Sequence, residues 1–550
     1  MDRNTLVAFF LIALVLLFTP KYMELFGPQN PNPTSSYSNE DQHNNNDSLL
    51  FVKDSIPKLT RPEPERLPDR LHDNTVTNIE TELYVAKVSS FNGGSIKDFF
   101  LKGFLSPDSQ EVNTIARNKK NNLEIEIQDL NGDLIPLNVD WALTTQPNRL
   151  AKNSEQTLEY SLELFPGKKI KKTLLFSPNN YTVEIKFDFE QVKNLIYRDV
   201  RFSWNGGLAT TEKDSLDDKT YFKAMVYQGN EMEELKVKES SRESKKLNGS
   251  TAWGAIRTKY FISALIPDKP ETIRFAEIFG EDKNQEEYSL SFVFDCFQKT
   301  SFTLYHGPLE YEKIKLLSVG LDEVMDFGWS FIRPISKAVL FSLKRMHDYI
   351  PNYGVVLIVF SILVKILVFP LTKKSYQSTA AMQEIQPEAN KLREKYKNNP
   401  QKLNQATMQL YKSKGVNPLG GCLPMLLQMP LLFALFQVFR TTIELRNEPF
   451  VWWIKDLSSP DVIVNLPFTI PLYGSHIAFL PILMALSTYA QQKMMSGGIQ
   501  QPQQKMMQNF MMVFFFLIFN NFPSGLNLYY TLFNVLTIAQ QKLLPNKPKA

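Results

Sequence analysis

Apolar residues are concentrated in two regions of this chain, a short run near the N-terminus and most of the sequence after Tyr353. Between about residues 71 and 320 the sequence instead alternates apolar and polar residues in short runs, as a water-soluble domain does. A helix needs about 20 mostly apolar residues to cross about 30 Å of hydrocarbon. The pattern therefore predicts a multi-domain membrane protein with one large aqueous domain.

The N-terminal run, Leu6–Phe18, follows Arg3 and fits either a signal peptide or an uncleaved signal anchor. A cleavable signal peptide ends in small residues of the A-x-A kind, whereas this run continues into Tyr22–Phe26. The sequence therefore favours a signal-anchor transmembrane helix within residues 1–28. Residues 29–70 are rich in Asn, Pro, Ser, Asp and Glu and have no apolar periodicity, which predicts a flexible linker.

Residues 71–320 show period-two alternation, interrupted by turn residues such as Asn92-Gly93-Gly94. This pattern predicts a large antiparallel β-sandwich rather than a βαβ fold. The domain contains no nucleophile elbow, phosphate loop or paired-carboxylate motif. The alternating runs are Leu83–Val88, Leu123–Ile127, Thr157–Leu164, Lys171–Phe176, Tyr181–Phe189, Tyr260–Leu265 and Tyr288–Phe294.

Residues 326–350 change to a helical period, with Ile332, Val339 and Leu343 on one face and Arg333 and Lys337 on another. Such a helix fits the membrane surface just before the chain enters the bilayer. A last helix packed on the sandwich fits the same pattern, because amphipathicity alone does not separate the two interpretations.

Further segments have the apolar character and roughly the length of membrane spans, and with the anchor they predict an α-helical transmembrane bundle. We expect one span before a polar stretch at residues 372–418, the remaining spans within residues 419–544, and a short tail at residues 545–550. The five expected core spans are residues 353–371, 419–442, 473–492, 508–522 and 525–543.

Basic residues set the orientation of these spans. Residues 372–418 carry nine Lys and Arg against three Glu, which places this stretch in the cytoplasm. Both termini are then cytoplasmic and the β-domain is periplasmic. Helical repeats on both sides of Asn398-Asn399-Pro400 predict two basic antiparallel helices. Such a hairpin could contact acidic lipid headgroups, ribosomal RNA or an acidic nascent chain, or it could simply be solvated.

The remaining composition limits the chemistry. The formal net charge is only +4, and the basic residues form no aromatic-interleaved groove, so we expect no DNA partner. Cys296 and Cys422 fall in different predicted compartments, so no internal disulfide is expected. The five histidines are scattered singly, without the spacing of a metal site. The sequence therefore predicts no metal, no cofactor and no enzymatic activity.

Lys365 is the only ionisable side chain well inside an expected core span. It lies about 10 Å from the cytoplasmic end at about 1.5 Å per residue, so its stem could reach the lipid headgroups. Ser361 is one turn earlier, and a polar stripe runs from Asn527 to Gln541 in the last span. Polar groups at this depth either line water or join helices to one another. The predicted hydrated groove consists of Ser361, Lys365, Gln428, Asn527, Tyr530 and Asn534.

A pocket with one positive charge and no carboxylate suits transient capture of a polar or negatively charged peptide better than transport of an ion. Beside it, the fourth core span is rich in Met and Phe, which gives a soft surface able to accept many apolar helices. An ordinary lipid-facing helix has the same composition. The predicted apolar surface for substrates consists of Met507, Met511 and Phe515.

Several short motifs follow one another in the C-terminal part of the chain. They are Val368–Thr372, Asn417–Cys422, Leu427–Pro430, Phe450–Leu457, Phe522–Leu526 and Leu528–Tyr530. Together and in this order they resemble those of the YidC membrane insertases. The resemblance implies a protein that inserts and helps fold nascent inner-membrane proteins, alone or beside the Sec translocon and its accessory subunits. It also implies contact with the ribosome and membrane lipids, a groove open to cytoplasm and lipid, and a supersandwich-like periplasmic domain.

The chain departs from this family pattern at two positions. Lys365 stands where such bacterial proteins usually carry Arg, which keeps the charge but removes the planar fork, and this argues against two-point recognition of a carboxylate. Asn521 stands where an aromatic residue often precedes the Phe-Pro-Ser-Gly turn, which predicts a more polar periplasmic wall.

Two other functions compete with insertion. The polar stripe by itself would allow a small-solute or ion transporter, but the spans lack buried carboxylates and show no internal repeat. The β-domain could carry a carbohydrate-processing enzyme, but no paired-carboxylate constellation is recognisable, and a fold does not carry a function.

Overall fold

The computed structural model describes residues 75–116, 121–145, 154–213, 215–283, 285–397, 399–415, 423–470, 473–495 and 502–543. The signal anchor, linker and tail predicted for residues 1–28, 29–70 and 545–550 lie outside these residues. The chain divides into two compact units, residues 1–63 with 500–510 and residues 64–499 with 511–550. The relationships below lie within the second unit.

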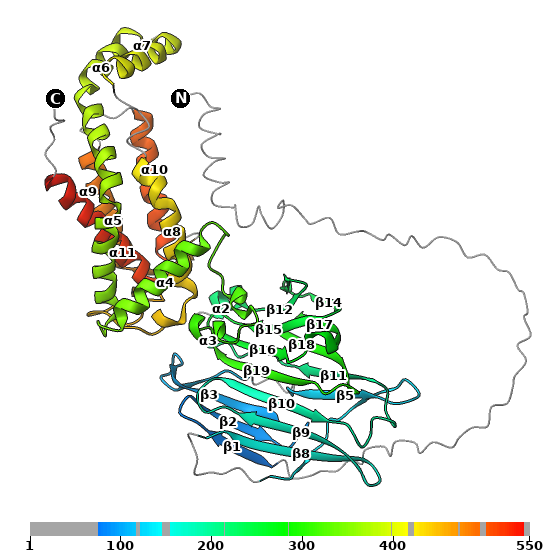
Figure 1. The fold of residues 1–550 in the computed structure, drawn as a ribbon. Coiled ribbons are helices and arrows are strands. Elements are labelled where there is room, and N and C mark those ends of the chain that lie inside the picture. Colours follow the sequence, from blue (N-terminus) through cyan, green and yellow to red (C-terminus); the bar gives the residue numbers. More distant parts are fainter. Residues whose placement is uncertain are drawn as a thin grey trace, which may run out of the picture. The chain divides into compact units, whose positions relative to one another are not determined.

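Antiparallel sheets form the described part of the chain before residue 309 (Figure 1). One sheet has the order β1 (Val76–Glu80), β2 (Tyr84–Ser89), β3 (Ser95–Leu105), β4 (Glu111–Asn113). A nine-stranded sheet has the order β13 (Glu231–Leu235), β12 (Lys223–Gln228), β15 (Thr251–Arg257), β16 (Phe261–Pro267), β19 (Ser301–Pro308), β10 (Thr182–Asp188), β9 (Lys168–Phe176), β8 (Gln156–Phe165), β7 (Ala142–Leu143). A six-stranded sheet has the order β14 (Arg242–Asn248), β17 (Ile273–Asp282), β18 (Glu286–Asp295), β11 (Asp199–Trp204), β5 (Glu124–Gln128), β6 (Leu134–Pro136).

Aromatic side chains join the nine-stranded and six-stranded sheets face to face. The ring centroids of Phe187 (β10) and Phe202 (β11) are 5.1 Å apart, and those of Phe294 (β18) and Phe302 (β19) are 5.4 Å apart. Buried and less buried positions alternate along strands such as β9, as the period-two pattern requires. The prediction of a β-rich domain before the helices is confirmed.

Helix α4 (Arg333–His347) is the first long helix after the sheets, and it lies within the predicted amphipathic segment. Gly328, with φ of 81°, precedes it, and Pro334 stands in its first turn, where a missing N–H costs nothing. Val339 and Leu343 are buried while Phe341 on the opposite face is exposed. The helix packs on α5 (Tyr353–Glu384) and α8 (Leu423–Thr441).

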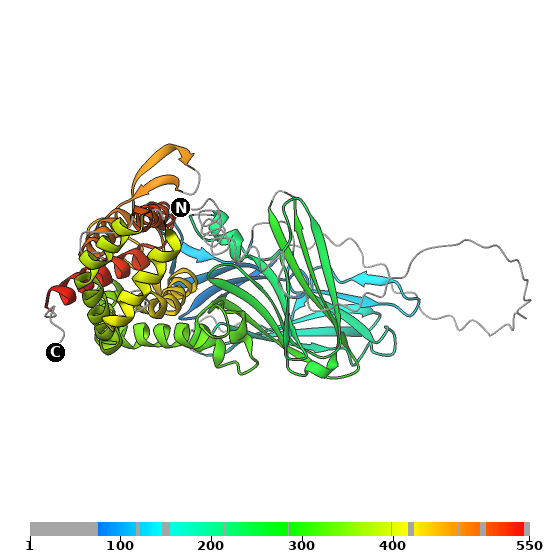
Figure 2. The same cartoon turned by 90° about the horizontal axis from the view of Figure 1, so that it is seen from above.

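The remaining long helices are α6 (Gln386–Lys395), α7 (Pro400–Ser413), α9 (Leu480–Met495), α10 (Pro502–Phe519) and α11 (Ser524–Leu543). Helices α5, α8, α9 and α11 form a bundle in which α11 contacts the other three (Figures 1 and 2). Short helices α2 (Ser215–Tyr221) and α3 (Tyr311–Lys315) and the 3₁₀ turns η1 (Pro270–Thr272), η2 (Leu321–Val324) and η4 (Ile443–Leu445) complete the helical elements of the described residues.

Helix α5 continues beyond Leu371, where the first core span was expected to end, and reaches Glu384. Among the described helices, α5 alone has a segment, Tyr353–Pro370, that is long and apolar enough by composition to cross a membrane, with a mean hydropathy of 2.4.

The apolar stretch at residues 473–478, which was expected to begin a span, is a strand instead. It forms β21 (Gly474–Ala478), which pairs with β20 (Val462–Ile470), and α9 begins only at Leu480. The Asn520 amide donates to the Tyr473 and His476 carbonyls at 2.8 and 2.7 Å and so fixes this segment to the end of α10. Asp461 accepts a 2.8 Å hydrogen bond from the Leu480 N–H, satisfying a donor at the start of α9. Hydropathy cannot reveal these contacts.

Candidate functional site

Helix α5 presents two different faces along its apolar part. Ile366 and Leu367 are 69% and 72% exposed, whereas Ser361, Val364 and Lys365 are buried, with Lys365 only 8% exposed. Exposed aliphatic residues on one face of such a helix suit contact with lipid. The cation predicted to be functional lies on the opposite face, against other helices.

The Lys365 ammonium bonds to α11. Its Nζ donates to the Thr537 hydroxyl at 2.6 Å and lies 4.3 Å from the centroid of the Phe533 ring. The Thr537 hydroxyl donates in turn to the Phe533 carbonyl at 2.7 Å, which leaves its lone pairs available to the ammonium. Ser361 lies one turn away on α5 and donates to the Leu357 carbonyl at 2.7 Å.

Thr537 was recognised within the polar stripe but was not among the residues assigned to the groove. The signal that could have selected it is its spacing, since it lies three residues after Asn534 on the same face of α11.

The stripe on α11 also joins this helix to its other neighbours. The Asn534 amide donates to the hydroxyls of Ser487 and Thr488 in α9 at 3.1 and 2.9 Å. The Asn527 amide donates to the Phe519 carbonyl at the end of α10 at 3.1 Å. The predicted groove residues therefore do not all meet at one point, because α11 contacts Lys365 of α5 through Thr537 and contacts α9 through Asn534.

Four polar side chains of α11 have buried atoms without a hydrogen-bond partner within the described part of the chain. They are the Asn527 carbonyl, the Tyr529 and Tyr530 hydroxyls, and the Gln540 amide. A buried polar atom left unsatisfied costs about 1–3 kcal/mol. A cluster of such atoms on one helix is characteristic of a functional surface that meets water or an incoming polar group.

The other residues predicted for the groove and the apolar surface are more exposed, or their side chains lie outside the described part of the structure. Gln428 is half-buried in α8. Phe515 of α10 is 36% exposed, and its ring centroid lies 5.8 Å from that of Phe519. The side chains of Met507 and Met511 are outside the described residues, so the apolar surface for substrates stays a prediction.

Two of the sequence motifs meet at the end of the bundle where α11 begins. The Ser524 hydroxyl donates to the Asp456 carbonyl at 2.7 Å, and the Gly525 N–H donates to the Leu457 carbonyl at 3.0 Å. A Cβ on Gly525 would lie 2.8 Å from the Phe439 ring, so a glycine is required there. The Phe-Pro-Ser-Gly turn is thus fixed to the segment that follows the Trp452–Trp453 pair.

The segment predicted as a basic hairpin forms α6 and α7. Pro400 stands in the first turn of α7, and the Asn399 side chain caps that helix by accepting from the Lys402 N–H at 3.1 Å. Lys414, just after α7, pairs with Glu388 of α6 at 2.8 Å. Lys391, Lys395 and Lys397 are exposed.

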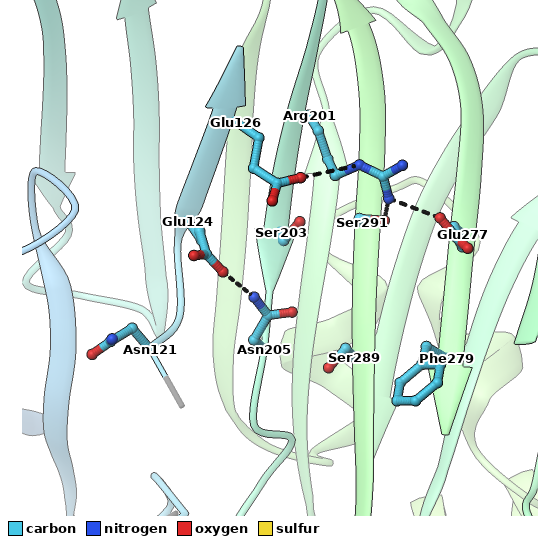
Figure 3. A pocket seen from close by; sticks show the side chains of 10 residues that line it. All are labelled: Asn121, Glu124, Glu126, Arg201, Ser203, Asn205, Glu277, Phe279, Ser289 and Ser291. Carbon is cyan, nitrogen blue, oxygen red and sulfur yellow. Dashed lines mark hydrogen bonds and ion pairs between the residues drawn. The ribbon is translucent and has the colours of Figure 1, made fainter. Parts of the chain in front are cut away.

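The six-stranded sheet carries a polar hollow of about 520 Å³ on its outer face (Figure 3). Arg201 lies between Glu126 and Glu277, at 3.4 and 2.7 Å, and the Asn205 amide donates to Glu124. Burial raises the pKa of Glu126, and Arg201 opposes that rise. Each of the three carboxylates in the hollow therefore has a partner within the six-stranded sheet. No group of three or more His, Cys, Asp or Glu residues suited to a metal occurs in the described residues.

Ion pairs join the β-rich domain to α8 and the segment after it. Asp217 of α2 lies 2.7 Å from the Lys259 ammonium and 2.8 Å from the guanidinium of Arg440 in α8. Arg446 pairs with Glu212 at 2.8 Å. Burial alone would raise the pKa of Asp217, but Lys259 and Arg440 together hold it below its usual value. The carboxylate therefore stays charged and holds the two parts together.

Comparison with known proteins decides the family. The model of the 60Kd inner membrane protein matches residues 345–550, and that of the YidC periplasmic domain matches residues 76–338. The membrane protein insertase YidC of Prosthecochloris aestuarii is 33% identical over 98% of this chain and 94% of the relative. The chain belongs to the YidC family of membrane protein insertases.

A second relative agrees. The membrane protein insertase YidC of Chlorobium limicola is also 33% identical, over 98% of this chain and 94% of its own length. A crystal structure of an active YidC insertase with its first transmembrane domain resolved covers 86% of this chain and 94% of that chain, at 17% identity and a TM-score of 0.37. The predictions of a YidC-type insertase, with a periplasmic domain and without enzymatic activity, are confirmed.

Proposed function

We propose that this protein inserts nascent inner-membrane proteins into the bilayer by receiving their polar segments beside Lys365, between α5 and α11. The observation that carries the proposal is the buried ammonium, which donates a 2.6 Å hydrogen bond to a neutral hydroxyl, that of Thr537. A cation that bonds a neutral group can exchange that group for the carboxylate or carbonyl of a passing peptide. Lysine, unlike arginine, makes this contact as a point charge.

The unsatisfied polar atoms of α11 support a hydrated path. They extend the polar surface that Asn534 and Thr537 form on this helix, and they belong to Asn527, Tyr529, Tyr530 and Gln540. Water beside them would satisfy their hydrogen bonds and shorten the apolar distance that a polar segment must cross. The apolar part of the same substrate would leave toward lipid along α10, whose Phe515 ring is partly exposed.

The proposed topology has the signal anchor and five core spans, built on α5, α8, α9, α10 and α11, in an inner membrane. The nine cations of residues 372–418 favour a cytoplasmic position for α6 and α7 and for both termini, with the β-rich domain in the periplasm. In this orientation α6 and α7 could receive substrates from the ribosome. The Sec translocon and its accessory subunits are further proposed partners.

A transporter remains the competing function. Several stripe residues join helices, as Asn534 does with Ser487 and Thr488. A stripe engaged in this way is less suited to a continuous solute path than to a one-sided groove. Depletion of the protein should therefore reduce insertion of model membrane proteins before it changes the flux of small solutes.

Crosslinking tests the proposal directly. A photo-crosslinking residue at position 361 or 537 should capture a ribosome-stalled nascent span that carries a polar translocated tail. The matched control is position 486, because Leu486 of α9 is 60% exposed and belongs to the same bundle. Equal crosslinking at all three positions would show general contact with the bundle and would contradict a groove beside Lys365.

A further inference from the structure

The hairpin of β20 and β21, which we call the lateral arm, exposes the apolar side chains of β20. Ile463, Val464 and Phe468 are 47%, 49% and 60% exposed. A strand that packs one face on a protein core normally alternates buried and exposed residues. No residue of β20 is buried, so its apolar side chains are as accessible as its polar ones.

The arm also lacks the features that keep an exposed hairpin soluble. Residues 462–478 contain no Lys, Arg, Asp or Glu. The sheet has only two strands, so each has one edge without a neighbouring strand in the described structure. Charged residues usually protect such edges in water, where a contiguous apolar surface favours aggregation. These properties indicate a surrounding medium other than bulk water.

The arm is held to the helices along β21, from Tyr473 at the turn to Ala478. The Asn520 side-chain carbonyl accepts from the Ala478 N–H at 2.9 Å, and its amide binds the Tyr473 and His476 carbonyls. Asp461 accepts from the Trp453 indole at 3.0 Å as well as from the start of α9. Seen along the helices, the orange hairpin projects sideways from the bundle (Figure 2). Its direction is therefore fixed by α9 and the turn between α10 and α11.

The arm leads directly into α9, which has exposed residues of its own. β21 ends at Ala478, α9 starts at Leu480, and Leu486 and Tyr489 on α9 are both exposed. If α9 spans the bilayer, the arm stands at the level where this span leaves the hydrocarbon, on the side of the β-rich domain. Trp452, which is 87% exposed, lies with the arm in the connection between α8 and α9. Tryptophan is enriched at the interface between membrane and water.

We propose that the lateral arm is an interfacial anchor that inserts its apolar side chains among phospholipids of the periplasmic leaflet. The outer edge of β20, which no strand covers in the described structure, defines its depth, because unpaired N–H and C=O groups are tolerated among hydrated headgroups and not in hydrocarbon. Through Asn520, lipid contact by the arm also fixes the ends of α10 and α11, which border the proposed groove. The inference rests on the proposed membrane topology and not on the role of Lys365.

Nitroxide accessibility in phospholipid nanodiscs tests this inference on the full chain. Cys296 and Cys422 are the only cysteines, so a Cys296→Ser, Cys422→Ser background accepts single labels. Labels at Ile463 and Phe468 should collide more with oxygen than with a water-soluble nickel chelate. The matched control is Leu134 of β6, which is 59% exposed and should show the opposite preference.

A further label at Leu486 separates a failure of this inference alone from a failure of the proposed membrane topology. If Leu486 lies in lipid while positions 463 and 468 behave like position 134, the arm is in water and the inference is wrong. If both reagents are excluded from positions 463 and 468, protein covers the arm, and the inference is again wrong. If Leu486 itself is accessible to nickel, α9 does not span, and both the topology and the inference fail.

Discussion

The ammonium of Lys365 in α5 and the hydroxyl of Thr537 in α11 form a 2.6 Å hydrogen bond between helices that are 172 residues apart at this point. The contact gives the lysine a defined position on the buried side of α5, away from the exposed Ile366 and Leu367. Simple snorkelling along a lipid-facing surface would not produce it. Lys365 is therefore both a link between helices and the charge in the proposed groove, and the two roles need separate tests.

Thr537→Val tests the link. Valine has a similar shape but cannot accept the hydrogen bond, and loss of an acceptor for a charged donor costs about 1.5–3 kcal/mol. We expect a lower unfolding temperature in nanodiscs and a moderate insertion defect that does not depend on the charge of the substrate tail. Thr537→Ser keeps the hydroxyl and is the matched control. Identical unfolding temperatures for the two variants would show that the hydrogen bond contributes nothing to stability.

The ion pairs around Asp217 predict a pH dependence of stability. The folded carboxylate has a lowered pKa, so its contribution is fully present above the ordinary pKa of an aspartate and is lost as the pH falls through the lowered value. Asp217→Asn should therefore reduce stability at neutral pH by about 1–3 kcal/mol, with a smaller difference from the parent in acid. Thermal unfolding measured across this pH range checks the expectation.

A more exposed ion pair provides the control for Asp217. Asp348 pairs with Arg345 at 3.1 Å, and both side chains are more than half exposed. Asp348→Asn should change stability by less than about 1 kcal/mol at any pH. A destabilisation by Asp217→Asn that is equally large in acid would point to altered packing rather than to charge.

The sequence predicted the elements whose physical cause is local. The run Tyr181–Phe189 contains β10 (Thr182–Asp188), because alternation along one strand is enough to define it. The segment at residues 473–478 was placed wrongly, because its apolar residues resemble a span and the contacts from Asn520 and Asp461 that make it a strand come from distant positions. The sequence identifies Lys365 as an isolated charge in an apolar segment. It does not identify the partner Thr537, because that contact depends on the packing of α5 against α11.

The basic helices α6 and α7 predict an electrostatic role. Reversal of Lys391, Arg393, Lys395 and Lys397 to Glu should slow insertion with little loss of stability, because the three lysines are exposed and make few structural contacts to lose. The control is Lys283→Glu in the β-rich domain, where the side chain is 80% exposed. Unchanged insertion at physiological salt would mean that these cations are only solvated.

Removal of the β-rich domain tests whether it is mainly a scaffold. Deletion of residues 73–310 takes away Asp217 and Glu212, the partners of Arg440 and Arg446, but leaves α4 and the helical bundle. We expect cells that depend on this variant to survive, with insertion reduced less than by loss of Lys365. Complete loss of insertion by a stably accumulated variant would assign the domain an essential role.

Substitution of Lys365 itself separates charge from structure. Lys365→Arg keeps the charge and should preserve insertion, whereas Lys365→Ala should impair substrates with acidic translocated tails most, because the proposed capture is electrostatic. A pair of model substrates that differ only in tail Asp residues can be compared by protease-protected insertion in both variants. Thr537→Val is the control for the lost link between α5 and α11, since it removes the hydrogen bond but keeps the ammonium. A defect in Lys365→Ala that is equal for the two tails, and no larger than that of Thr537→Val, would reduce Lys365 to a link between α5 and α11 and leave capture by charge without support.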